Sequence, residues 1–322
     1  MKVFITGICG FLGSHIAIKL ASKGFEIIGI SRKSNPPRMF ENLNIKVYFG
    51  NIQEIQDIQK IEHKYKNFDY IIHTASLFDD NIYTLKSNFN ATQLILNSAI
   101  KMKVKNFIFT STRGTIGVDE NPHDSNEDSV DFKNFKLNDN YIKSKIKSEE
   151  IVTKANNEKK IKTFILCPTA IIGPNDFKPT PIGKLVRDLL NGKINFYIDG
   201  SINLIDVRDA AEAFYLLMIN KKRSHKYGLG GYNIKLSEFF KLLLKNKKSN
   251  KIPYSIPDIL VIIIAKFLRM FPFLKTINQM YSYEKIMKLK KGYSQFDSKK
   301  IQTEIQLNLS SIDKTIADMI NE

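Results

Sequence analysis

The sequence has little cysteine, little arginine and no tryptophan, and its apolar runs are short. Cys9 and Cys167 are the only thiols in 322 residues. Two cysteines cannot form a disulfide framework or a four-thiolate metal site, and no Cys/His cluster has the spacing of a zinc site. We therefore expect no bound metal and a reduced, cytoplasmic location.

The apolar segments do not resemble membrane spans or export signals. The apolar run at residues 1–6 meets a glycine at once, which differs from a signal peptide. The most apolar segment, residues 256–273, is interrupted by Asp258, Lys266, Arg269 and Pro272, whereas a span needs about 20 clean residues. We expect no transmembrane helix.

The net charge of +17 comes mostly from lysine, with 42 Lys and only 7 Arg. Recognition of phosphates and bases favours the planar guanidinium group, so the composition argues against a nucleic-acid partner. Residues 1–150 are nearly balanced, with 20 basic and 17 acidic residues, whereas residues 151–322 have 29 basic and 15 acidic ones. The excess is either a solvated surface or an attraction for an anionic substrate or membrane surface.

Short runs rich in Val, Ile and Phe alternate with longer helical patterns in the first half of the chain, as in βαβ units with a parallel sheet. The pattern predicts strands at about 2–6, 26–30, 45–49, 69–73, 106–111 and 161–167, and helices at about 11–23, 54–65, 84–102 and 140–159. After residue 168, Pro-rich and Gly-rich loops separate helices near 182–191, 207–220 and 236–245.

These elements predict an α/β fold in two parts. Residues 1–168 form a dinucleotide-binding domain of the Rossmann type, with a doubly wound parallel sheet. Residues 169–322 form a smaller α+β substrate-binding region, whose chain is partly interleaved with the first domain.

The first strand runs directly into a glycine-rich turn and a helix. Gly7 permits the tight turn, Gly10 lets the backbone approach a pyrophosphate, and Gly13 lets the helix pack on the strand. The N-terminus of the helix, which begins at Phe11 and Leu12, offers unpaired N–H groups to the phosphates. This context predicts a bound dinucleotide.

The end of the second predicted strand indicates which dinucleotide is preferred. An acid there binds the ribose of NAD, whereas arginine accommodates the 2′-phosphate of NADP. Here Ser31 stands at the position of the acid, and Arg32 and Lys33 follow it. The sequence slightly favours NADP over NAD.

Catalytic candidates follow the fifth predicted strand, which ends in three hydroxyl residues, Thr110 to Thr112. Tyr141 and Lys145 come next, one helical turn apart on one face. A neighbouring ammonium and a nicotinamide cation favour the phenolate form of tyrosine, which allows Tyr141 to act as acid or base. Thr112 can then form a hydrogen bond with the reacting oxygen, and Lys145 can bind the nicotinamide ribose. The equally spaced pair of Tyr281 and Lys285 lies after the sheet, so position favours Tyr141.

With these motifs the chain resembles the extended short-chain dehydrogenases/reductases, in the NAD-dependent epimerase/dehydratase group. The resemblance implies cofactor contacts from the glycine loop, from Lys145 and from Asn51, Ile52, Thr74, Ala75, Ser76, Asn88, Thr110 and Pro168. Residues 178–181, 203–209 and 296–300 resemble more particularly the branch of dihydroflavonol-4-reductase-like proteins and hopanoid-associated sugar epimerases.

Several positions depart from the family's usual pattern. Thr112 replaces Ser, Asn51 replaces an adenine-contacting Asp, and Cys167 replaces an Asn found in many nucleotide-sugar enzymes. Arg113 and Gly114 stand where sugar dehydratases have an Asp-Glu pair, which disfavours dehydration. Residues 200–203 lack the arginine that often clamps a sugar diphosphate in the epimerases.

These features favour a reductase or dehydrogenase that transfers a hydride at a carbinol or ketone carbon, with Tyr141 as acid/base. An NAD-dependent sugar or nucleotide-sugar 4-epimerase and a non-catalytic dinucleotide-binding protein are the alternatives. The expected substrate is a small carbonyl, alcohol or sugar derivative, and analogy with the family suggests a homodimer.

Peripheral membrane contact is a further hypothesis, because residues 241–300 hold 14 basic and 3 acidic residues around the apolar segment 256–273. A buried helix in the substrate region is the alternative interpretation of that segment.

Overall fold

The computed structural model describes residues 1–32, 36–78, 81–119, 121–129, 139–247, 252–261, 263, 292 and 294–321. Lys33, the pair Tyr281 and Lys285, and most of the apolar segment 256–273 lie outside the described residues. Within the described residues, no helix is both long enough and apolar enough to cross a bilayer.

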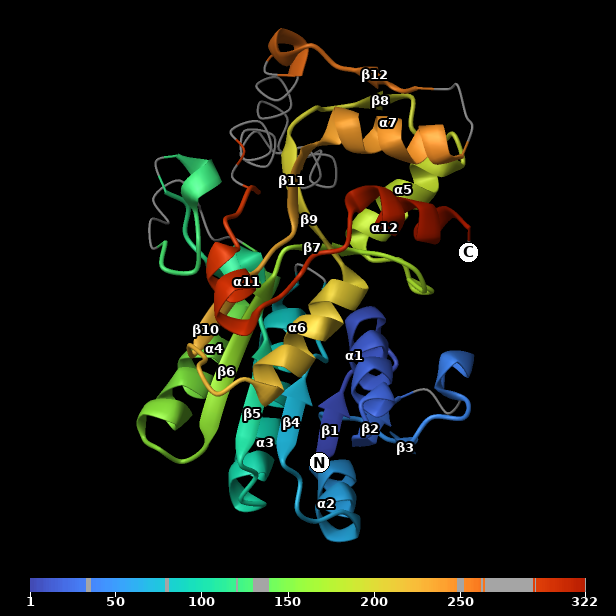
Figure 1. Ribbon diagram of the computed structural model, residues 1–322. Coiled ribbons are helices and arrows are strands. Elements are labelled where there is room, and N and C mark those ends of the chain that lie inside the picture. Colours follow the sequence, from blue (N-terminus) through green and yellow to red (C-terminus); the bar gives the residue numbers. More distant parts are fainter. Residues whose placement is uncertain are drawn as a thin grey trace.

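A seven-stranded parallel sheet forms one half of the molecule, at the bottom of Figure 1. Its order is β10-β6-β5-β4-β1-β2-β3, and every neighbouring pair is parallel. The strands are β1 (Lys2–Thr6), β2 (Glu26–Ser31), β3 (Ile45–Phe49), β4 (Tyr70–His73), β5 (Asn106–Thr110), β6 (Lys162–Pro168) and β10 (Lys226–Leu229). The prediction of a doubly wound parallel sheet is confirmed.

Helices cover both faces of this sheet because its central strands are apolar on both sides. One face packs against α1 (Phe11–Ser22) and α6 (Val207–Ile219). The other packs against α2 (Ile55–Lys64), α3 (Ile82–Lys101) and α4 (Asn140–Asn157). The predicted strands and helices of the first half agree with these bounds to within a few residues.

Two elements from beyond residue 168 complete this layer. Strand β10 pairs with β6, so that Tyr227 lies beside Leu166. Helix α6 packs on α1, and the Tyr70 hydroxyl donates a 2.9 Å hydrogen bond to the carbonyl oxygen of Met218. The second half of the chain therefore supplies part of the main sheet.

The smaller region has its own sheet, in the order β11-β9-β7, with β7 (Ala170–Ile172), β9 (Ser201–Asp206) and β11 (Tyr232–Lys235). A separate apolar core forms between this sheet and the helices α5 (Pro181–Leu190), α7 (Leu236–Asn246) and α12 (Ile312–Ile320). The predicted helices near 182–191 and 236–245 correspond to α5 and α7.

The remaining elements are short. Strands β8 (Phe196–Tyr197) and β12 (Tyr254–Ser255) pair at the top of Figure 1, and α11 (Lys299–Ile305) packs near β10. Single 3-10 turns are η1 (Arg38–Phe40), η2 (Arg113–Thr115) and η3 (Pro122–Asp124). Of these turns, η2 follows β5 directly, at the edge of the sheet where the candidate site lies.

Candidate active site

The glycine-rich turn between β1 and α1 has no room for a side chain at two of its glycines. Gly7 has φ +71°, and a Cβ there would lie 2.8 Å from the backbone nitrogen of Ala75. A Cβ on Gly13 would lie 2.2 Å from the carbonyl oxygen of Gly7. The backbone of the turn thus packs against the loop after β4 and against the first turn of α1.

The start of α1 is suited to an anion. Gly10 is the N-cap and is exposed, and within the described residues this cap has no side-chain hydrogen bond and the first turn has no acidic residue. Phe11, Leu12 and Gly13 follow, so their N–H groups point from a helix N-terminus towards the open side of the turn. These features fit the pyrophosphate of a dinucleotide.

The loop after β4 is held from two sides. The Thr74 hydroxyl donates a 2.7 Å hydrogen bond to the carbonyl oxygen of Thr6. Asn88 accepts from the backbone N–H of Leu77 at 2.9 Å and donates to the Ser144 hydroxyl at 3.1 Å. Asn88 therefore ties the loop that contains Ala75 and Ser76 to helix α4.

His73, at the end of β4, belongs to a buried polar chain. Its Nδ1 lies 2.6 Å from the Thr6 hydroxyl and its Nε2 lies 3.1 Å from the Thr92 hydroxyl. Burial lowers the pKa of His73 from 6.5 to about 3, and the charge of Lys145 acts in the same direction. At neutral pH the imidazole is uncharged and structural.

The ends of β2 and β3 lie together, since the N–H of Gly50 donates to the carbonyl oxygen of Ser31 at 2.9 Å. Ser31 is half-buried and Arg32 is exposed. The side-chain oxygen of Asn51 accepts from the N–H of Gln53 at 3.2 Å, and the N–H of Asn51 donates to Asp57 at 2.9 Å. Asn51 thus shapes the turn in which Ile52 lies half-buried.

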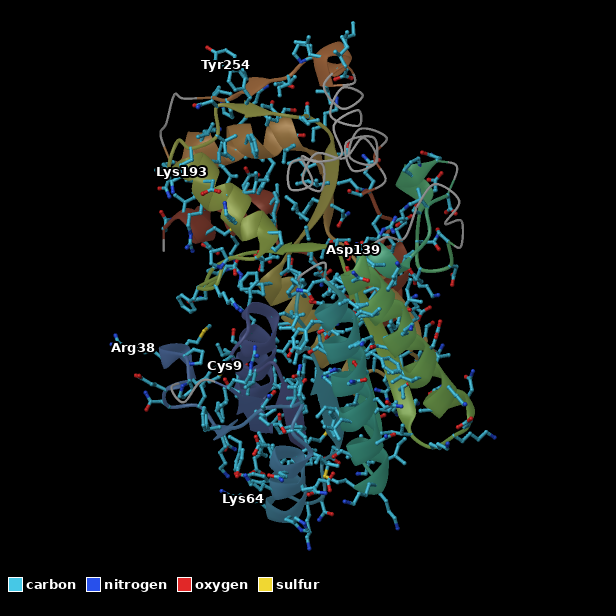
Figure 2. All side chains as sticks on the ribbon, turned by 180° about the vertical axis from the view of Figure 1, so that it is seen from behind. Cys9, Arg38, Lys64, Asp139, Lys193 and Tyr254 are labelled. Carbon is cyan, nitrogen blue, oxygen red and sulfur yellow. The ribbon has the colours of Figure 1, made fainter. Side chains whose placement is uncertain are left out.

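Thr112, Tyr141 and Lys145 come together after β5 and on the first turns of α4. The Thr112 side chain lies close enough to the Tyr141 phenol to lower the pKa of that phenol. Asp139 caps α4 by accepting from the N–H of Ile142 at 3.1 Å, and Figure 2 shows Asp139 near the middle of the molecule. The capped turn places Tyr141 where the main sheet meets the smaller region.

Lys145 lies beneath Tyr141 and is only 3% exposed. Its ammonium group is 4.8 Å from the ring centre of Phe109 and 5.9 Å from that of Tyr141. Burial lowers the pKa of Lys145 to about 8, although the charge of Glu149 acts in the opposite direction. Burial also raises the pKa of Tyr141, whereas the nearby Thr112 side chain acts to lower it.

The other predicted cofactor residues surround this group. Thr110 is 6% exposed, and its hydroxyl has no hydrogen-bond partner within the described residues. Pro168 is the buried last residue of β6. All these positions are at the carboxyl ends of parallel strands, which is where ligands bind in doubly wound folds. A buried polar atom that lacks a partner there fits a ligand that supplies one.

Two neighbours of this group were not identified from the sequence. Phe78, which is 65% exposed, packs its ring 5.0 Å from that of Tyr141. Glu149 lies one turn after Lys145 and binds both ends of the segment that contains Thr112. The spacing of 141, 145 and 149 at i, i+4 and i+8 is a signal that could have identified Glu149.

Arg113, which stands where sugar dehydratases have an acidic residue, has a structural role in this chain. Its guanidinium group donates to the carbonyl oxygens of Ile116 at 2.8 Å and Gln295 at 3.4 Å, and it stacks 5.1 Å from the ring centre of Phe296. Burial lowers the pKa of Arg113 to about 10. Arg113 thus fastens residues 295–296 to the loop after β5.

The arrangement as a whole combines an anion-binding turn with a phenol, a hydroxyl and an ammonium group. A phenol next to an ammonium can transfer a proton to or from a substrate oxygen. The described residues contain no cluster of His, Cys, Asp or Glu able to hold a metal ion. Proton transfer beside a dinucleotide is the chemistry that these groups can perform.

Known proteins share both the sequence pattern and the fold. The sequence profile of the NAD-dependent epimerase/dehydratase family matches residues 3–234. A Synechocystis sp. protein provisionally named dihydroflavonol 4-reductase is 31% identical over 238 residues, which cover 72% of this chain and 68% of that protein. Sterol demethylase protein B of Methylococcus capsulatus is 22% identical over 76% of this chain and 74% of its own length.

A solved structure supports the fold independently. The UDP-glucose 4-epimerase of Bifidobacterium longum, in complex with NAD+ and UDP, has a TM-score of 0.77 and 19% sequence identity, covering 100% of this chain and 97% of its own. The predicted type of enzyme, an NAD(P)-dependent oxidoreductase or epimerase of the extended short-chain dehydrogenase type, is confirmed. The chain belongs to the NAD-dependent epimerase/dehydratase family.

Proposed function

We propose that the protein is a dinucleotide-dependent reductase or dehydrogenase that acts at a carbinol or ketone carbon, with Tyr141 as acid/base. The observation that carries this proposal is the buried Lys145 ammonium, 5.9 Å from the ring centre of Tyr141, with the Thr112 side chain close to the same phenol. In this proposal Thr112 and Tyr141 bind one substrate oxygen, and Tyr141 gives or takes its proton.

Lys145 has two functions in the proposed mechanism. Its positive charge favours the phenolate of Tyr141 over the neutral phenol. Its hydrogen bond to Thr110 fixes the ammonium at the strand end, where the ribose of the cofactor is proposed to bind. A bound nicotinamide would supply or accept the hydride.

The proposed cofactor is NADP. The end of β2 presents the hydroxyl of Ser31 and the exposed Arg32, so no carboxylate is there to accept from both ribose hydroxyls, and Arg32 has no acceptor at all. A guanidinium group suits a 2′-phosphate. Arg32→Ala is expected to weaken the binding of NADPH at least tenfold and to leave the binding of NADH nearly unchanged. Equal losses for both cofactors would refute the preference.

The 4-epimerase is the second candidate, since a structural neighbour of that type binds NAD+ and UDP. The start of β9 argues against a sugar-diphosphate clamp in this chain. Asn203 is 2% exposed, donates to Asn233 at 2.8 Å and accepts from the N–H of Gly231 at 2.9 Å. The side chain of Asn203 therefore joins β9 to β11 and does not face a substrate diphosphate.

Purification with cofactor analysis separates the two candidates. A reductase is expected to exchange its cofactor and to oxidise added NADPH with at least one member of a carbonyl panel. NAD that survives dialysis, without NADPH consumption by any carbonyl, would refute the reductase and support the epimerase. Native mass spectrometry of the same sample tests the proposed homodimer.

We also propose that the end of the molecule around β8 and β12 contacts an anionic membrane surface. Six large apolar side chains are at least half exposed there, namely Phe196, Ile252, Tyr254, Ile259, Leu260 and Ile263. The rings of Phe196 and Tyr254 are 6.2 Å apart, and Figure 2 shows Tyr254 and Lys193 at the end of the molecule opposite Lys64. Exposed apolar groups beside lysines suit anionic lipids.

Vesicle binding tests this surface. The protein is expected to sediment with phosphatidylglycerol vesicles at moderate salt, and Phe196→Asp with Tyr254→Asp is expected to abolish this binding. A matched double variant of two exposed apolar side chains on the other half of the molecule, Ile55→Asp with Tyr83→Asp, is the control. Failure of the wild-type protein to sediment would refute the membrane contact without affecting the proposed chemistry.

A further inference from the structure

A carboxylate near the candidate site has no part in the proton transfer described above. Glu149 is on α4, one turn after Lys145, and its side chain is 13% exposed. Four side chains from three other parts of the chain converge on it: Ser111, Thr115, Cys167 and Lys226. Glu149 therefore connects α4 to three other parts of the chain.

One oxygen of Glu149 holds both ends of the catalytic turn. Oε1 accepts from the hydroxyls of Ser111 and Thr115, the latter at 2.5 Å. These two residues flank Thr112, and the Thr115 hydroxyl also lies 2.9 Å from the carbonyl oxygen of Thr112. Glu149 thus holds the segment from 111 to 115 against helix α4, which also carries Tyr141 and Lys145.

The second oxygen of Glu149 forms an ion pair with the main sheet. The Lys226 ammonium, on β10, lies 2.7 Å from Oε2. Strand β10 pairs with β6, and β6 pairs with β5, so the two oxygens of Glu149 join α4 to the end of β5 and to β10, the strands on either side of β6. The charge of Lys226 also neutralises a carboxylate that would otherwise be poorly compensated.

From these contacts we infer that Glu149 is a positioning residue, which fixes the Thr112 segment against α4 so that Thr112 and Tyr141 face the same substrate oxygen. Lys226 is its counter-ion. The inference rests on the proposed function for its effect on turnover, but it also predicts properties of the free protein. A shift of about 1 Å at a reacting group can reduce turnover about 100-fold.

Electrostatics gives a second, independent consequence. The ionisable groups around Lys145 are Tyr141 and Glu149 on its own helix, His73 on β4 and Cys167 on β6. Burial lowers the pKa of His225, and the charge of Glu149 acts in the opposite direction. The negative charge of Glu149 raises the pKa of Lys145. We expect the positive charge of Lys226, which is paired with that carboxylate, to act in the opposite direction. Removal of either charge must therefore move the titration of Lys145, and in opposite directions.

Three variants separate charge from geometry. Glu149→Gln keeps the size of the side chain and an oxygen acceptor but removes the charge. Glu149→Asp keeps the charge but shortens the side chain by one methylene group. Lys226→Met removes the counter-ion at a side chain that is 27% exposed. The titration of Lys145 in the free protein is followed by NMR of 13Cε-labelled lysine, with Lys145→Met to assign its resonance.

The inference predicts that the Lys145 midpoint falls by at least about half a pH unit in Glu149→Gln and rises in Lys226→Met. In Glu149→Asp we expect kcat to fall at least tenfold, with little change in KM and with an unchanged Lys145 midpoint. Absence of opposite shifts, or full turnover in Glu149→Asp, would overturn it. An inactive wild-type protein would refute only the proposed function, because the NMR titration needs no substrate.

Discussion

The ammonium group of Lys145 donates a hydrogen bond of 2.8 Å to the carbonyl oxygen of Thr110, the last residue of β5. This bond joins the helix that carries the phenol to the strand that carries the hydroxyls. It also uses one of the three donors of the ammonium, so two remain for Tyr141 and a cofactor hydroxyl. Both the charge and the length of the Lys145 side chain are therefore expected to affect turnover.

Because the pKa of Lys145 is lowered to about 8, its charge is present below that pH and is lost above it. We predict that kcat/KM for carbonyl reduction falls as pH rises through about 8. Lys145→Arg is expected to remove this alkaline limb, because arginine stays charged, but to reduce kcat at least tenfold because the guanidinium is too large for the site. A pH profile in Lys145→Arg identical to that of the wild-type protein would contradict the assignment.

Tyr141→Phe removes the proposed acid/base and leaves the ring that packs on Phe78. We expect kcat to fall about 10²- to 10⁴-fold, since that is the usual effect of general acid/base catalysis. Cofactor affinity, measured by quenching of NADPH fluorescence, should change less than twofold. Tyr65→Phe, at the end of α2, is the matched control and should keep full turnover. Retention of turnover in Tyr141→Phe would exclude the proposed mechanism.

Gly13→Ala and Gly24→Ala form a matched pair of tests for the cofactor turn. At Gly13 the new Cβ would meet the carbonyl oxygen of Gly7 at 2.2 Å, so we expect the turn to shift and NADPH binding to weaken more than 100-fold. At Gly24 nothing lies within 4 Å, and φ is +81°, so only backbone strain of about 1 kcal/mol should appear in unfolding. Calorimetric titration and urea unfolding check the two outcomes.

His73 makes stability depend on pH. Its pKa is about 3 in the folded protein and about 6.5 in the unfolded chain, so the unfolded chain binds more protons between these values. Stability is therefore complete above pH 6.5 and is lost as pH falls towards 3, by about 2 kcal/mol at pH 5. Urea unfolding at pH 7 and pH 5 measures the loss, which should shrink in His73→Gln but persist in the control His63→Gln, an exposed side chain.

The first half of the fold could be predicted because each of its signals is local. A buried parallel strand is a continuous apolar run, and the helix after Gly13 begins at a glycine turn, so Phe4 and Ile16 identify their elements without their partners. The spacing of Tyr141 and Lys145 is local in the same way. The residues around them were predicted as site residues on these grounds and on family resemblance.

The contacts that were not predicted join distant parts of the chain. Strand β10 has four residues, and its β partner β6 lies about sixty residues earlier, so no periodicity marks it. The helical spacing places Glu149 on the face of α4 that carries Tyr141 and Lys145, but its partners Ser111 and Lys226 come from distant parts of the chain. Such contacts depend on tertiary packing, which a single sequence does not encode in a local pattern.

The position of β10 has a consequence for synthesis of the protein on the ribosome. Strand β6 can pair only with β5 until residues 226–229 have left the exit tunnel. Until then, the backbone from Ile165 to Pro168 is an unpaired strand edge. The counter-ion of Glu149 arrives with the same strand. Completion of the nucleotide-binding layer therefore has to wait for more than two thirds of the chain, which makes chaperone dependence and late acquisition of cofactor affinity expected properties of this fold.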